Sequence, residues 1–189
     1  KYFKFIYLFF KELYTFFCHY WYTRKTIHLK ASAPDIPLIL IDTFSFPGYI
    51  DKDRYYNYLW DSLDNDQRKH TYFVPSITMV KLTDLLSAYS TLRLSCRNYL
   101  IKQDYLQIKD IIYALTHSLR VMKLKVKPVS ILGVDIAPLV KEELRSTKGY
   151  SDAVEALLNY RFAKRLRERN IKLRLVVDWF ENQVIDKGW

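Results

Sequence analysis

The sequence predicts an α/β domain built on a parallel sheet that is flanked by helices. The compact apolar run at residues 38–41 has the composition of a strand that is buried on both faces. Residues 71–74 are predicted as a second short strand, and the β-branched and leucine-rich run at 171–177 as a buried strand. The segments between them repeat apolar residues at intervals of three and four, which is typical of amphipathic helices. The order strand, helix, strand, helices, helix, strand is that of a parallel α/β domain, whose strands all end at one edge of the sheet.

Composition limits the classes of partner. The formal net charge is +10 and the sequence pI is about 9.5, so we expect an anionic partner: nucleic acid, phospholipid headgroups or a phosphorylated small molecule. Cys18 and Cys96 lack metal-ligand spacing, which predicts a reducing compartment and no metal site. None of the four glycines forms a phosphate-binding loop, which disfavours an ordinary dehydrogenase or P-loop enzyme. No tightly bound cofactor is predicted.

Residues 1–30 form an aromatic-rich amphipathic helical segment, which we expect to be distinct from an α/β domain at 36–189. Twelve of the first twenty-two residues are aromatic, and the polar residues fall on one narrow helical stripe: Lys1, Lys4, Lys11, Glu12, Thr15 and His19. Three interpretations remain open: a helix lying in a membrane interface, a helix docked on other protein, or a helix buried in this domain with the polar stripe facing solvent. The membrane interpretation assigns lipid contact to Phe9, Phe10, Phe16, Phe17, Trp21, Arg24 and Lys25.

The first half of the domain is predicted as strand, helix, strand. After a linker rich in proline and alanine, the strand at 38–41 ends in a loop that contains Asp42 and Ser45. A helix is expected at 53–63, and the strand at 71–74 ends in Pro75 and Ser76. Because strand carboxyl ends share one edge, Asp42, Ser45 and Ser76 are candidate binding residues.

The second half is predicted to be mainly helical. We expect helices at 77–91, 105–121 and 138–144, and residues 129–132 fit either a strand or a loop. A long helix is expected from Ser151 and Asp152, as capping residues, to about Glu168. Its outer face is basic and fits either a solvated surface or contact with phosphates or lipid headgroups. The basic residues of this face are Arg161, Lys164, Arg165, Arg167 and Arg169.

The last strand leads into the densest polar cluster of the chain. Acidic, amide and basic residues are interleaved with tryptophan and phenylalanine, and we select Asp178, Glu181, Asn182, Gln183 and Lys187 as candidate site residues. The carboxylates of Asp178 and Glu181 are the best acid–base candidates by position. The alternative is a surface loop with helix-capping acids.

Two stretches resemble the bacterial surface-carbohydrate biosynthesis proteins, which are glycosyltransferases of O-antigen or capsule assembly. The resemblance is carried by Leu157-Leu-Asn-Tyr-Arg-Phe-Ala-Lys164 and by Val177-Asp-Trp-Phe-Glu-Asn-Gln-Val-Ile-Asp-Lys-Gly-Trp189. Residues 40–44 and 53–56 fit the same pattern more loosely. The similarity covers about forty residues closely, and residues 1–30 and the middle of the chain carry no matching motif.

The resemblance implies half of a two-domain, GT-B-like glycosyltransferase with a Rossmann-like sheet, and the chain is expected to be part of a longer protein. A nucleotide-sugar donor and a lipid-linked glycan acceptor would meet in the cleft between the halves. Glu181 would position or deprotonate an acceptor hydroxyl and Asn182 would bind sugar hydroxyls, with Asp178 beside them. The implied location is the cytoplasmic face of the bacterial inner membrane, with an anionic membrane surface as a further partner.

Two other classes of function remain as alternatives. The chain fits a non-catalytic, membrane-peripheral scaffold of polysaccharide assembly. It also fits, less well, a nucleic-acid-binding module that uses the basic helix around 161–174, where the aromatic residues do not alternate with the basic ones as stacking platforms would. No nucleic-acid partner is therefore expected.

Overall fold

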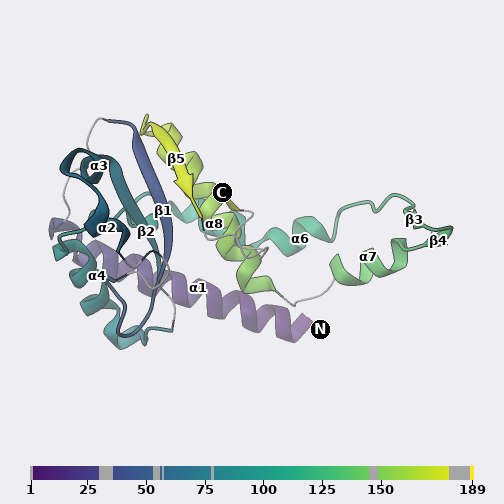
Figure 1. Cartoon of the computed structure of the whole chain (residues 1–189). Helices are drawn as coiled ribbons and strands as arrows, with labels where there is room; N and C mark the ends of the chain where they lie inside the picture. Colours follow the sequence, from purple (N-terminus) through teal and green to yellow (C-terminus); the bar gives the residue numbers. More distant parts are fainter. Residues whose placement is uncertain are drawn as a thin grey trace.

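The computed structural model of the chain contains a three-stranded parallel sheet flanked by helices, as in Rossmann-like folds (Figure 1). It describes residues 2–29, 36–52, 56, 58–77, 79–144, 149–178 and 188–189. The strands are β1 (Leu38–Ser45), β2 (Thr71–Ile77) and β5 (Leu173–Val177), in the order β2-β1-β5. The predicted parallel α/β class is therefore confirmed.

The chain reverses its direction of travel across the sheet after β2, so the switch in direction lies between the neighbouring strands β1 and β5. It moves from β1 to β2 on one side, and then returns to place β5 on the other side of β1. The pairing of β1 with β2 runs from Ile39↔Thr71 to Ser45↔Ile77, and its pairing with β5 reaches Ile41↔Val177. In open α/β sheets, ligands bind at the carboxyl ends of strands around such a reversal.

Strand β5 is more exposed than its sequence predicts. β1 and β2 are largely buried, but β5 lies at an edge of the sheet, where Leu173 and Leu175 remain exposed. The expectation of a buried third strand is thus wrong for the first half of β5. Residues 171–177 include Lys172 and Arg174, and a strand that is buried on both faces has a nearly continuous apolar run instead.

The main core lies between the sheet and helices α1 (Tyr2–Lys25), α5 (Ile108–Leu115) and α8 (Tyr150–Glu168) (Figure 1). Because side chains alternate along a strand, Leu38 and Leu40 of β1 and Val74 of β2 share this face. The opposite face packs around Ile41, Phe73 and Trp60, together with the short helix α2 (Leu59–Ser62).

Helix α1 packs directly on the α/β domain. It contacts α4 (Leu85–Leu94), α5 and α8, and Phe16 is only 7% exposed within the main core. Phe16 is thus a core residue, and the expectation that it contacts lipid is wrong. None of the helices in the described ranges has the length and apolar character needed to cross a bilayer.

Several helix boundaries differ from the prediction. Within the described residues, the helix expected at 53–63 is confined to α2, and Asp64 instead caps α3 (Asn65–His70). The helix expected from residue 77 begins at α4, after the 3-10 turn η2 (Leu82–Asp84), because β2 continues to Ile77. The helix expected at 105–121 begins after η3 (Lys102–Asp104) and is divided at Thr116 into α5 and α6 (His117–Val121).

Residues 122–144 form an arm that projects away from the sheet (Figure 1). It contains a small antiparallel hairpin, β3 (Ser130–Ile131) and β4 (Val134–Asp135), followed by α7 (Ala137–Leu144). Residues 129–132, whose sequence fits either a strand or a loop, are thus partly strand. The short helix predicted at 138–144 is confirmed.

Two arginines of α8 point inward. Arg161 and Arg165 both bind the carboxylate of Asp110 on α5, and Arg165 is 4% exposed. The expectation that these two belong to a basic outer face is therefore wrong, whereas Lys164, Arg167 and Arg169 of the same predicted face are exposed. The N-cap of α8 is Gly149, and neither Ser151 nor Asp152 provides the predicted side-chain cap.

Candidate functional site

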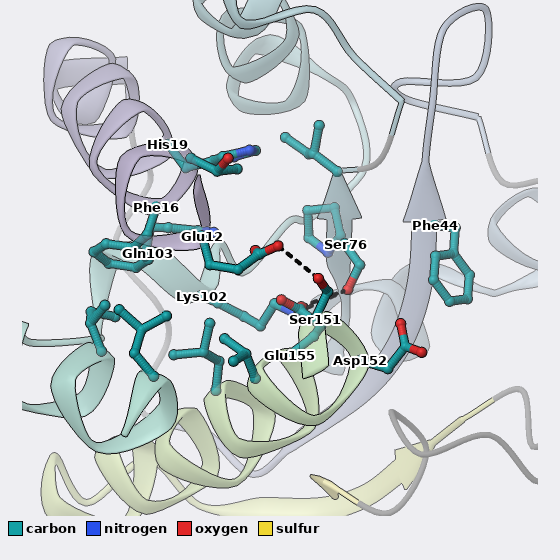
Figure 2. A pocket seen from close by; sticks show the side chains of 17 residues that line it. Glu12, Phe16, His19, Phe44, Ser76, Lys102, Gln103, Ser151, Asp152 and Glu155 are labelled. Atoms are coloured by element: carbon teal, nitrogen blue, oxygen red, sulfur yellow. Dashed lines mark hydrogen bonds and ion pairs between the residues drawn. The ribbon is translucent and has the colours of Figure 1, made fainter. Parts of the chain in front are cut away.

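A cavity of about 330 Å³ lies beside the carboxyl ends of β1 and β2 (Figure 2). Its size is at the lower end of the range for small-molecule sites. Its walls come from both strands, from the inner face of α1, and from η3, α5 and the amino-terminal part of α8. The lining residues are Glu12, Thr15, Phe16, His19, Phe44, Pro75, Ser76, Ile77, Lys102, Gln103, Ile111, Leu115, Ser151, Asp152, Val154, Glu155 and Leu158.

A buried lysine forms one wall of the cavity. Lys102 is 2% exposed, and its ammonium group donates to Ser76 Oγ at 3.0 Å and to Asn159 Oδ1 at 2.8 Å. It also pairs with the carboxylate of Glu155. An ammonium group has three donors, so these three partners satisfy it completely. Lys102 therefore holds strand β2 and helix α8 together beneath the cavity.

Glu155 is one of the charged groups that line the cavity. A third of its side-chain surface (33%) remains accessible, although it pairs with Lys102 and accepts a weak hydrogen bond from Ser76. Burial alone would raise the pKa of Glu155, but the charge and hydrogen bond of Lys102 outweigh burial and hold the pKa below its ordinary value. Glu155 is thus an ionised acceptor that has lone pairs available for a ligand.

Helix α1 adds further polar groups to the wall. Ser151 Oγ donates to Glu12 at 2.7 Å, which joins α8 to α1 across the cavity (Figure 2). His19 Nδ1 forms a hydrogen bond of 2.7 Å with the hydroxyl of Tyr89. Burial lowers the pKa of His19 to about 4, so its ring is neutral at pH 7. The polar stripe predicted from the sequence is therefore divided: Glu12, Thr15 and His19 line the cavity, whereas Lys4 and Lys11 are exposed to solvent.

Asp42 lies on the same face of the sheet as Phe44 and Ser76, because alternate residues of a strand share a face. Burial raises the pKa of Asp42 to about 6, and the negative charge of Asp178 adds to this effect against the lowering effects of Lys102 and Trp189. Trp189 Nε1 donates to Asp42 Oδ2 at 2.6 Å. Asp42 Oδ1 is buried and has no hydrogen-bond partner among the described residues.

The structure brings together three of the predicted site residues. The register Ile41↔Val177 places Asp42 beside Asp178 at the carboxyl end of the sheet, with Ser76 on the neighbouring strand. Ser45 lies on the opposite face, where it is buried and donates to the carbonyl of Ile50 at 3.0 Å. Its assignment to the same wall is therefore wrong. The remaining candidates lie outside the described residues: Glu181, Asn182, Gln183 and Lys187.

The residues expected to contact a membrane lie on two different faces of α1, one exposed and one packed against the domain. Phe10, Phe17, Trp21, Arg24 and Lys25 are exposed. Phe9 is partly buried against the main core, into which Phe16 is packed.

Sequence reasoning missed Lys102, Glu155 and Asn159. Glu155 and Asn159 have the four-residue spacing of one helix face, next to the apolar residues Val154 and Leu158, which was an available signal. Lys102 has no such signal, because its partners are 26 to 57 residues away.

The fold and this cavity define a parallel α/β domain with a small-molecule-sized polar site at the carboxyl edge of its sheet. In the described part of the chain, no three histidine, cysteine or acidic side chains are grouped as a metal site requires. Comparisons with protein-family models, with curated proteins and with solved structures found no match.

Proposed function

We propose that this chain is part of a glycosyltransferase that transfers a sugar from a nucleotide-sugar donor to a lipid-linked glycan of the bacterial surface. The main support is the cavity beside the carboxyl ends of β1 and β2, the edge of a parallel sheet at which α/β proteins bind their ligands. In the proposed two-domain, GT-B-like arrangement, this cavity forms one wall of the cleft, at the cytoplasmic face of the inner membrane.

The lining of the cavity suits a sugar. Carboxylates accept hydrogen bonds from hydroxyl groups, and Glu12, Asp152 and Glu155 supply three of them. Phe16 and Phe44 supply apolar surface for the C–H faces of a pyranose ring. In this proposal Glu155, held in place by Lys102, fixes the orientation of the sugar.

Transfer requires a base at the acceptor hydroxyl. The hydroxyl oxygen forms a bond to the anomeric carbon, the bond from that carbon to the nucleotide diphosphate breaks, and the hydroxyl proton passes to a carboxylate. Glu181 is the proposed base, with Asp178 beside it at the end of β5, and Asn182, Gln183 and Lys187 bind sugar or phosphate oxygens. Asp42 is a buried neighbour of Asp178 at this edge of the sheet, and the two carboxylates interact electrostatically.

The test is sugar transfer by the full-length protein and by Glu155→Gln and Glu181→Gln variants. Both changes keep side-chain size and remove a charge, and we expect each to lower kcat/KM at least about 100-fold. Glu142→Gln, an exposed change on α7, is the matched control and should leave turnover unchanged. Full activity of both variants would exclude the proposed roles, and absence of transfer by the natural protein with every donor would favour a scaffold.

A further inference from the structure

The outward face of α1 carries a continuous row of aromatic side chains, which we call the outer aromatic stripe. It comprises Phe3, Tyr7, Phe10, Tyr14, Phe17 and Trp21. The successive spacings of four and three residues keep all six on one side of the helix. Each side chain is between 45% (Phe17) and 90% (Phe3) exposed. Figure 1 shows α1 as one long helix, whose carboxyl-terminal half passes beside α4 and whose amino-terminal half extends toward the labelled N-terminus.

Cations surround this stripe. Lys4 and Lys11 directly follow Phe3 and Phe10, so they flank the stripe on one side, and both are exposed. Arg24 and Lys25 are also exposed, and they follow Trp21 at the helical spacings that continue the stripe. Lys25 Nζ lies 5.4 Å from the centre of the Trp21 ring.

The outward face of α1 carries no compensating acid. Glu12 is the sole acidic residue of α1, and it points toward the cavity, where it accepts the hydrogen bond from Ser151. None of Lys4, Lys11, Arg24 and Lys25 forms an ion pair with another described residue. The stripe is therefore an apolar surface with an uncompensated positive border.

We propose that α1 docks the protein on an anionic lipid bilayer, with the outer aromatic stripe in the interface and the flanking cations among the headgroups. Tyrosine and tryptophan favour this zone because each has an apolar ring and a polar group. Lysine and arginine extend their charged ends toward lipid phosphates while their stems stay against apolar groups.

Charge repulsion disfavours a second copy of the chain as the partner that covers the outer aromatic stripe. If two copies packed stripe against stripe, Lys4, Lys11, Arg24 and Lys25 of one copy would face the same cations of the other in either orientation. No outward acid of α1 would offset this repulsion. An anionic bilayer supplies the missing negative charge along the whole helix.

Docking by α1 also locates the cavity relative to the membrane. The opposite side of the same helix contributes Glu12, Thr15, Phe16 and His19 to the cavity wall. One helix diameter, about 10 Å, therefore separates the cavity from the lipid surface. A lipid-linked acceptor is then within reach of the site, a consequence that rests on the proposed function.

The experiment is sedimentation of the full-length protein with vesicles. We expect binding to vesicles of phosphatidylglycerol and phosphatidylethanolamine, weakened by salt, and much weaker binding to phosphatidylcholine alone. The stripe variant Phe10→Ser/Tyr14→Ser/Trp21→Ser should bind at least about 100-fold more weakly. Lys4→Gln/Lys11→Gln should bind about tenfold more weakly or worse.

The matched control replaces three exposed apolar residues outside α1: Met79→Ser/Leu132→Ser/Leu139→Ser. It should bind as the natural protein does, and thermal melts should show that all variants are folded. The proposal is overturned if the stripe variant binds normally, if the control loses binding equally, or if the natural protein binds no vesicle. It is also overturned if the stripe mediates a dimer in solution that does not bind vesicles. Donor binding measured without lipid tests the proposed function separately.

Discussion

Asp42 combines burial with a raised pKa, which makes the stability of the fold depend on pH. Its pKa rises from 3.8 in a model peptide to about 6 in the folded chain, chiefly because of burial. The folded state therefore binds more protons than the unfolded state in this range, and the contribution of Asp42 to stability falls as pH rises from about 4 to about 6. Asp42→Asn removes this effect, while its amide oxygen can still accept the hydrogen bond from Trp189.

We expect Asp42→Asn to gain stability relative to the natural protein by about 3 kcal/mol between about pH 4 and pH 7. Urea denaturation of both proteins across this range measures the difference. A difference that does not change with pH would mean that Asp42 titrates normally and is not a strained carboxylate at the sheet edge.

His19 should make the stability of the fold depend on pH in the opposite direction. Burial lowers its pKa from 6.5 to about 4, so the folded state binds fewer protons than the unfolded state between these values. Stability conferred by the neutral ring is thus lost as pH falls from about 6.5 to about 4, by about 3 kcal/mol. His19→Gln should remove this acid sensitivity, and an NMR titration should show no protonation of His19 above about pH 5. A normal titration near 6.5 would contradict the buried placement of the ring against the cavity.

The identities of the site residues were only partly predictable from the sequence. Asp42, Ser76 and Asp178 were found because each follows an apolar run, and strand ends of a parallel sheet meet at one edge. Ser45 was misplaced because its face depends on how far β1 continues, and the strand extends to Ser45 itself. Glu12 and His19 were recognised as a stripe, but periodicity gives only the angle between residues on a helix, and not which side faces the domain.

Gly188 packs closely against the backbone of helix α8 at Ala156. A methyl group there would lie 2.2 Å from the carbonyl oxygen of Ala156, and helix backbone cannot move aside easily. Gly188→Ala should displace Trp189, which contacts Phe162 and binds Asp42. We expect a loss of about 2 kcal/mol in the free energy of unfolding, together with an Asp42 pKa above 6.

Trp189→Phe is the comparison for that experiment. It removes the indole N–H but keeps a ring against Phe162, so it should raise the pKa of Asp42 with a smaller loss of stability. If Gly188→Ala melts like the natural protein and leaves the pKa of Asp42 unchanged, the close approach to α8 does not occur.

Helices α5 and α8 are joined by one buried carboxylate. Asp110 is fully buried and accepts from Arg161 at 2.6 Å and from Arg165 at 2.7 and 2.8 Å. Burial alone would raise the pKa of Asp110, but hydrogen bonds from Arg165, the Gln107 backbone and Arg161 hold it below its ordinary value. The stability that ionised Asp110 confers on the folded state is therefore present at neutral pH and is lost as pH falls below about 4.

Asp110→Asn should lower the free energy of unfolding at pH 7 by about 3 kcal/mol, because it removes the buried charge that Arg161 and Arg165 share and leaves Arg165 only the partly exposed Glu168 as an ion-pair partner. Asp84→Asn, at an exposed carboxylate, should change it by less than about 0.5 kcal/mol. Chemical denaturation measures both variants. Equal stability of the two would show that the arginines are solvated as the sequence alone suggests.

Across the whole molecule, the order of the main elements along the chain and the parallel sheet type followed from the sequence, whereas the spatial order of the strands and the packing partners did not. Compact apolar runs separated by helical periodicity leave few alternatives to a parallel sheet. Contacts such as Arg165 with Asp110 join residues that are 55 positions apart, and no local pattern predicts them. The exposed half of β5 is a different case, because Lys172 and Arg174 already interrupt its apolar run in the sequence.

The arrangement as a whole places the polar cavity, the carboxylates of the sheet edge and the outer aromatic stripe around a single helix, α1. Its inner face closes the cavity and its outer face is exposed. This geometry links the proposed sugar chemistry to the proposed lipid surface, although each is tested by a separate experiment.

The decisive measurement is NMR mapping of nucleotide-sugar binding on the ¹⁵N-labelled protein. Shifts that saturate with donor concentration should cluster at Ser76, Ser151 and Glu155, and Glu155→Gln should abolish them while Glu142→Gln should not. Shifts elsewhere on the chain, or none with any nucleotide sugar, would contradict a sugar-binding role for the cavity.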